Sequence, residues 1–120
     1  MTEKPRLKAL RTVVQRVIKS QTMKQRYKAL DAFNELNDDG WQTCAVGCFL
    51  NDCGINVKQV AACKQSGLGS AVSGLVQPEI KDAGSSFEAN VLSKRKVNQL
   101  KGLKFLDKLI RAKPCSILKV

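Results

Sequence analysis

Apolar and polar positions alternate at helical spacing from the start of the chain. After Pro5, apolar residues recur at intervals of three and four, which is the spacing of one helix face. These residues are Leu7, Leu10, Val14, Val17 and Ile18. Proline is well accommodated in a first helical turn, so the pattern predicts a first helix over residues 5–20.

A capping box opens the second predicted helix. Thr22 and Gln25 stand three residues apart, a spacing at which side chains and backbone amides satisfy one another at a helix start. The residues expected to face the core from this helix are Met23, Tyr27, Leu30, Phe33 and Leu36. The Asn-Asp-Asp-Gly sequence of residues 37–40 predicts where it ends.

Three shorter helices are predicted in the middle of the chain. Apolar residues at helical spacing from Trp41 indicate a helix that ends at a Gly54 cap. Asn56 is a suitable cap for a fourth helix, which Gly67 should stop. Residues 67–77 keep helical spacing despite several glycines and serines, so we expect a closely packed small-residue helix there.

The C-terminal third is predicted to contain the longest helix. Residues 78–84 are expected to be a linker, and a second capping box at residues 85–88 opens a helix that extends to Lys113, before Pro114. The whole pattern predicts a mostly α protein, a single-domain bundle of about five helices over residues 1–120. Residues 1–4 and 115–120 are expected to be flexible or extended tails, the latter as a short strand or an arm.

Length and composition agree with one cytosolic or nuclear domain. A chain of 120 residues with 43% hydrophobic content can bury a core without disulfides or metal. No apolar stretch approaches the roughly 18 residues of a transmembrane segment, and we expect no export signal. The five cysteines are therefore expected to be reduced thiols, as is usual in the cytoplasm or nucleus.

Positive charge is concentrated at the two ends of the sequence. Residues 1–30 contain nine Lys and Arg against Glu3, and residues 94–120 contain nine against Asp107. The residues between them have a net negative charge, and the whole chain carries +11. Such segregation is stable only if the basic segments face water or a polyanion.

Common catalytic sites are disfavoured by the residue types present. The chain contains no histidine, the side chain most used for proton transfer near neutral pH, so we expect no enzyme of ordinary type and no cofactor. The glycines of residues 67–74 match no phosphate-loop pattern. Zinc is a lesser alternative for four cysteines that lack the usual C-x2-C pairs, and we expect core packing for them instead. They are Cys44, Cys48, Cys53 and Cys63.

The basic helix faces give the leading functional hypothesis, which is nucleic-acid binding. The predicted contacts are Lys4, Lys8, Arg11, Lys19, Lys94, Lys101, Lys104, Lys108 and Arg111. Lysine predominates in the C-terminal row and binds phosphate as a point charge, which favours contacts with the DNA or RNA backbone at low sequence specificity. This small basic composition is common among accessory proteins of phages and viruses.

Two alternatives fit the same charge pattern. One is an inhibitor or adaptor that docks on an acidic protein surface, which would need an exposed apolar patch around residues 67–77. The other is peripheral binding to anionic membranes, which would need the apolar face of residues 7–18 to be free. Homodimerisation is compatible with each of these hypotheses.

Overall fold

A computed structural model describes residues 3–20, 22–35 and 45–119, with only the backbone for residues 32–35. Of the described residues 79% are helical and none belongs to a β-strand, which confirms the predicted all-α class. The described chain forms eight helices of six residues or more and one single turn, rather than about five. No helix within these ranges is both long and apolar enough to cross a membrane.

The first two helices follow the sequence pattern closely. α1 (Pro5–Lys19) has proline in its first turn and buries Leu7, Leu10, Val14 and Val17. α2 (Met23–Glu35) begins with the predicted capping box: the Gln25 amide donates to Thr22 Oγ1 at 3.2 Å, and the Thr22 amide donates to Gln25 Oε1 at 3.3 Å.

The core face of α2 differs in part from the prediction. Leu30 is buried and Met23 is half-buried, but Tyr27 is 50% exposed because it lies at the edge of the apolar stripe. The side chains of Phe33 and Leu36, the turn predicted at residues 37–40, and Trp41 lie outside the described residues.

Short helices α3 (Ala45–Asp52), α4 (Val57–Cys63) and α5 (Leu68–Leu75) follow. Gly54 ends α3 with a φ of 84°, a left-handed conformation that suits glycine, and the Ile55 amide donates to the Leu50 carbonyl at 2.9 Å. Asn56 caps α4 by accepting from the Gln59 amide at 3.1 Å. These predictions are confirmed, as is the small-residue helix α5.

The end of α4 was assigned to the wrong residue. Gln65, with a φ of 50°, adopts the left-handed conformation that closes the helix, and the Ser66 amide donates to the Ala61 carbonyl at 2.9 Å. Gly67 instead precedes α5 as its N-cap. The pattern of hydrogen bonds, rather than the presence of glycine, therefore determines where α4 ends.

Two features of the C-terminal third contradict the prediction. Residues 78–84 are not a linker but form most of α6 (Pro78–Ser85), in which proline takes a first-turn position. The expected long helix is divided into α7 (Phe87–Leu92) and α8 (Lys96–Arg111). Ser85 ends α6 rather than capping the next helix, since its hydroxyl donates to the Asp82 carbonyl at 2.8 Å.

Side chains replace the helical hydrogen bonds at the break between α7 and α8. Arg26 Nη1 donates to the carbonyls of Leu92 and Ser93 at 3.2 and 3.1 Å, and Gln99 Nε2 donates to the Ser93 carbonyl at 2.9 Å. The two helices then pack together, and a Cβ at Gly102 would stand 2.8 Å from Val91 Cγ2. The chain can reverse here because the Leu92 and Ser93 carbonyls have hydrogen-bond donors and the two helices pack closely.

The C-terminal residues are anchored to the helices. α9 (Pro114–Ile117) is a single turn, and Ile117 is buried. Leu118 forms an isolated antiparallel bridge with Val76. The Gln77 amide donates to the Ile117 carbonyl at 3.0 Å, and the Lys119 amide donates to the Leu75 carbonyl at 2.9 Å. Residues 115–119 therefore combine a helical turn with a short extended segment.

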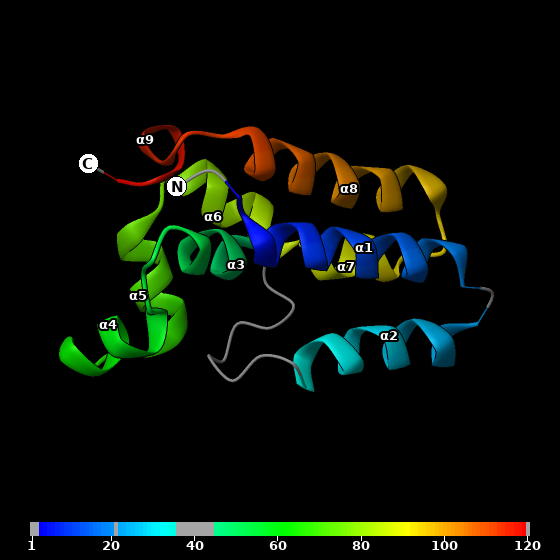
Figure 1. Ribbon diagram of the computed structural model, residues 1–120, viewed down its shortest axis with the longest axis horizontal. Helices are drawn as coiled ribbons and strands as arrows, with labels where there is room; N and C mark the ends of the chain where they lie inside the picture. Colours follow the sequence, from blue (N-terminus) through cyan, green and yellow to red (C-terminus); the bar gives the residue numbers. More distant parts are fainter. Residues whose placement is uncertain (1–2, 21, 36–44, 120) are drawn as a thin grey trace.

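α1 lies at the centre of the arrangement, in contact with α2, α3, α7 and α8. Figure 1 shows α8, α1 and α2 side by side in a front layer, with α7 behind α1. α8 runs antiparallel to α1, and α2 also reverses direction. The apolar faces of these helices meet in one buried cluster, which leaves their polar faces on the outside of the front layer.

Opposite charges join three helix ends at the start of α1. Lys4 is only 5% exposed, and its Nζ donates to the carbonyls of Leu109 at 2.9 Å, Ile110 at 2.7 Å and Ala112. Asp52, at the end of α3, accepts from the Arg6 and Leu7 amides, each at 3.0 Å. A cation thus caps the C-terminus of α8, and an anion caps the N-terminus of α1.

We predict that Lys4→Met lowers the free energy of unfolding by about 2 kcal/mol, because the last carbonyls of α8 lose their buried donor. Urea denaturation followed by circular dichroism measures the change. Lys8→Met is the control, because Lys8 lies on the exposed side of α1. It should change stability by less than about 0.5 kcal/mol. Equal stability of the two variants would contradict the capping role.

A second stability prediction concerns the end of α4. Gln65→Gly should stabilise the protein by about 0.5 kcal/mol, because relief of the left-handed strain slightly exceeds the added entropy of the unfolded chain. The same substitution at Gln59, inside α4, should destabilise by about 0.5 to 1 kcal/mol. Thermal unfolding of both variants measures these opposite signs, and a loss of stability in both would refute the argument.

Candidate nucleic-acid interface

The basic rows of the two end helices lie on neighbouring elements. α1 and α8 are in contact and antiparallel (Figure 1), and each helix has basic residues among its exposed positions. Together the two helices contain ten Lys and Arg, and Asp107 is their one acidic residue. We call the outward surface of α1 and α8 the cationic wall.

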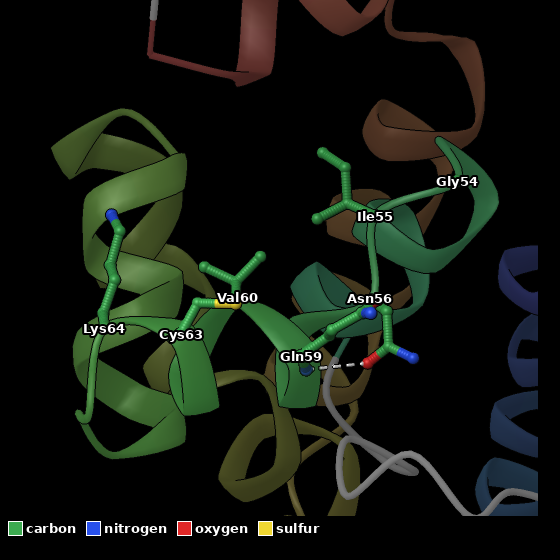
Figure 2. A pocket seen from close by; sticks show the side chains of 7 residues that line it. All are labelled: Gly54, Ile55, Asn56, Gln59, Val60, Cys63 and Lys64. Atoms are coloured by element: carbon green, nitrogen blue, oxygen red, sulfur yellow. Dashed lines mark hydrogen bonds between the residues drawn. The ribbon is translucent and has the colours of Figure 1, made fainter.

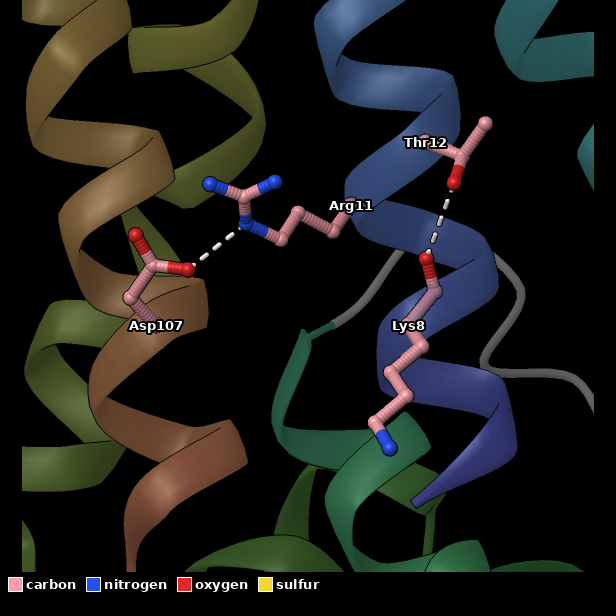
Figure 3. A network of polar contacts seen from close by, with 4 residues as sticks. All are labelled: Lys8, Arg11, Thr12 and Asp107. Carbon is pink, nitrogen blue, oxygen red and sulfur yellow. Dashed lines mark hydrogen bonds and ion pairs between the residues drawn. The ribbon is translucent and has the colours of Figure 1, made fainter. Parts of the chain in front are cut away.

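An ion pair joins the two helices across this wall. Arg11 Nε lies 2.7 Å from Asp107 Oδ1, and each side chain is about one third exposed. Figure 3 shows Arg11 extending from α1 toward Asp107 on α8, beside Lys8 and Thr12. The pair neutralises the single acid of the wall, so Asp107 does not offset the charge of the remaining lysines. Exposed ion pairs of this kind add little to stability.

Most of the predicted contacts are accessible. Lys8 and Lys19 are exposed on α1, and Lys94 is exposed just before α8. On α8 the exposed bases are Lys101, Lys104, Lys108 and Arg111. They follow one another at intervals of three and four over roughly 15 Å of helix, so they form a continuous row.

Lys4 does not belong to this set. Its side chain is buried, its ammonium group is held by the end of α8, and the same group lies 5.4 Å from the centre of the Phe49 ring. The prediction that Lys4 contacts nucleic acid is therefore corrected to a structural role. The helical periodicity failed here because Lys4 precedes the helix and has a φ of 47°.

Two exposed apolar side chains lie at the N-terminal end of the row on α8. Val97 and Leu100 are 53% and 45% exposed and lie at helical spacing from Lys101 and Lys104. Sequence reasoning had assigned no role to either of them. They add exposed apolar area next to the basic row.

Sequence reasoning also missed Lys28, which α2 adds beside the basic residues at the end of α1. Arg16, Lys19 and Lys28 line one groove between the end of α1 and α2. The short connection between the two predicted helices was the available signal, since it favours an antiparallel pair and so places Lys28 against the end of α1.

The described acidic side chains are mostly elsewhere. Glu79 and Asp82 belong to α6, Glu88 to α7, and Asp52 is occupied by the N-terminus of α1. α7 lies behind α1 in Figure 1. The fold therefore separates most described acids from the wall.

The cysteines have different environments. Cys48 is buried in the core, as predicted, whereas Cys63 and Cys115 are exposed, and Cys44 lies outside the described residues. Burial raises the pKa of the half-buried Cys53 thiol; Lys4 opposes this shift and Asp52 adds to it. Within the described ranges no three Cys, Asp or Glu side chains are grouped so as to hold a metal.

Cys63 lines a hollow of about 410 Å³ beside α4. Figure 2 shows it with Ile55, Asn56, Val60 and Lys64 around the same space. The Asn56 side chain accepts from the Gln59 amide and so serves the helix. Neither an acid nor a histidine lines this hollow to act as a general base.

The features required by the alternatives are not met in the described structure. The apolar face of α1 is buried at Leu7, Leu10, Val14 and Val17, so it is not free to enter a membrane. In α5 the exposed positions are Gly69, Ser70 and Gly74, while Ala71 and Val72 are buried. That segment therefore offers no exposed apolar patch to a protein partner.

Thiol accessibility gives a direct prediction. In native protein near neutral pH, iodoacetamide should alkylate Cys63 and Cys115 first, and Cys53 at least about tenfold more slowly. A raised pKa lowers the thiolate fraction at a given pH, so the labelling rate of Cys53 should level off at higher pH. Mass spectrometry of tryptic peptides follows each site, with unfolded protein as the control. Equal native rates would be inconsistent with the burial described.

Comparison with known proteins provides no further guide to function: no family model, no curated protein and no solved structure matches this chain.

Proposed function

We propose that this protein is a small, non-enzymatic nucleic-acid-binding protein that contacts the phosphate backbone with low sequence specificity. The observation that supports it best is the cationic wall. Two adjacent antiparallel helices contain ten bases, and their one acid is already paired with Arg11. A surface of this kind attracts a polyanion over a distance comparable to the Debye length.

The proposed contacts are the exposed predicted bases together with Arg11. They are Lys8, Arg11, Lys19, Lys94, Lys101, Lys104, Lys108 and Arg111. Six of them are lysines, on α1, on α8 or just before α8. Lysine binds phosphate without the bidentate geometry that distinguishes guanine. The exposed thiols Cys63 and Cys115 suit the reducing cytoplasm or nucleus, where nucleic acid is found.

Docking on an acidic protein surface is the second candidate. The exposure of Val97 and Leu100 among lysines favours it, because protein partners combine apolar contact with complementary charge. Nucleic acid is the preferred partner, because the exposed row on α8 contains four basic residues and only two apolar ones accompany it.

The salt dependence of binding tests the proposal. Contact with about five phosphates predicts a slope of about −4 to −5 for log K against log salt on duplex DNA. Fluorescence anisotropy with labelled duplexes and single strands, from about 50 to about 300 mM salt, measures this slope. Changing Lys101, Lys104 and Lys108 together to Gln should reduce its magnitude by about 2 to 3.

A matched control uses the three bases of the middle segment. Changing Lys58, Lys64 and Lys81 together to Gln removes the same charge away from the cationic wall, so the slope and affinity should stay near those of the wild type. Undetectable binding at about 50 mM salt, or equal losses in the two triple variants, would exclude the wall as a nucleic-acid interface.

A further inference from the structure

A groove of about 510 Å³ lies beside the cationic wall, between the end of α1 and the facing side of α2. Arg16, Lys19 and Ser20 line it from the end of α1, and Gln25, Lys28 and Ala29 line it from α2. Arg16 and Lys28 belong to neither predicted row. The groove contains Arg16, whereas the row on α8 is dominated by lysine.

Three basic side chains therefore line one shallow groove. No acidic residue lines the groove, and within the described residues none of the three has an ion-pair partner. Ser20 donates its hydroxyl to the Arg16 carbonyl at 2.7 Å, which partly satisfies the end of α1 at this position.

Stabilisation of the α1 dipole does not account for all three cations. Arg16 and Lys19 lie in the last turn of α1, where positive charge is favourable. Lys28 lies within α2 rather than at a helix C-terminus, yet it lines the same groove. Its position adds a charge that the end of α1 does not need.

We propose that this groove binds a phosphate group carrying two or more negative charges, such as a phosphomonoester at a nucleic-acid end or the polyphosphate of a free nucleotide. A backbone phosphodiester carries a single charge, whereas a phosphomonoester carries about −1.5 to −2 at neutral pH, closer to the charge that three cations can balance. Arg16 supplies a planar donor pair for two phosphate oxygens, and Lys19 and Lys28 supply point charges.

The inference rests on the proposed function, but it can be wrong while that function holds. Short duplexes that differ only in a 5′-phosphate or a 5′-hydroxyl are compared by anisotropy, and the phosphorylated ends should bind about fivefold more tightly. Arg16→Gln with Lys28→Gln should remove this preference while leaving affinity for hydroxyl ends within about twofold. Lys24→Gln with Lys81→Gln removes the same charge outside the groove and should retain the preference.

Titration with inorganic pyrophosphate distinguishes the two sources of the ligand. A preference for phosphorylated ends indicates a strand end, whereas pyrophosphate binding that needs Arg16 and Lys28, without an end preference, indicates a free nucleotide. The chain has no histidine, so a preference that fades as pH falls through about 6 reports the ligand phosphate itself. If the protein binds duplexes but shows neither an end preference nor pyrophosphate binding, the groove is not a phosphate site. The proposal that the cationic wall binds nucleic acid would then still stand.

Discussion

The buried corner at Lys4 fixes where α1, α3 and α8 meet. Lys4 closes the C-terminal end of α8, and Asp52 closes the N-terminal end of α1, so two charged side chains connect α1, α3 and α8. A shift of α1 by one turn along α8 would break both sets of hydrogen bonds and leave buried charge uncompensated. The register between the basic rows of α1 and α8 is therefore fixed at one end of the pair.

Sequence reasoning succeeded where the determining partners are close along the chain. The Thr22–Gln25 box, the Asn56 cap and the Gly54 terminus each depend on residues no more than five apart. It failed where partners are distant: α7 ends because Arg26, more than sixty residues earlier, takes its carbonyls. Sequence reasoning does not find α6 because proline and glycine are typical of linkers, although proline also fits a first helical turn.

The same distinction applies to the candidate site. Exposed lysines on α1 and α8 follow from helical periodicity, which is a local property. The burial of Lys4 does not, because its acceptors lie more than one hundred residues away. The groove at Arg16 and Lys28 likewise depends on how α1 and α2 face each other, which the spacing of residues within either helix does not specify.

The reversal at Ser93 also sorts charge in three dimensions. A continuous helix would have extended α7 from the start of α8, whereas the turn folds α7, which contains Glu88, behind α1 (Figure 1). Positive and negative centres are thereby displaced from each other, and the molecule acquires a permanent electric dipole moment. Such a moment exerts a torque in an external field, so a polyanion would rotate the protein into its binding orientation before contact.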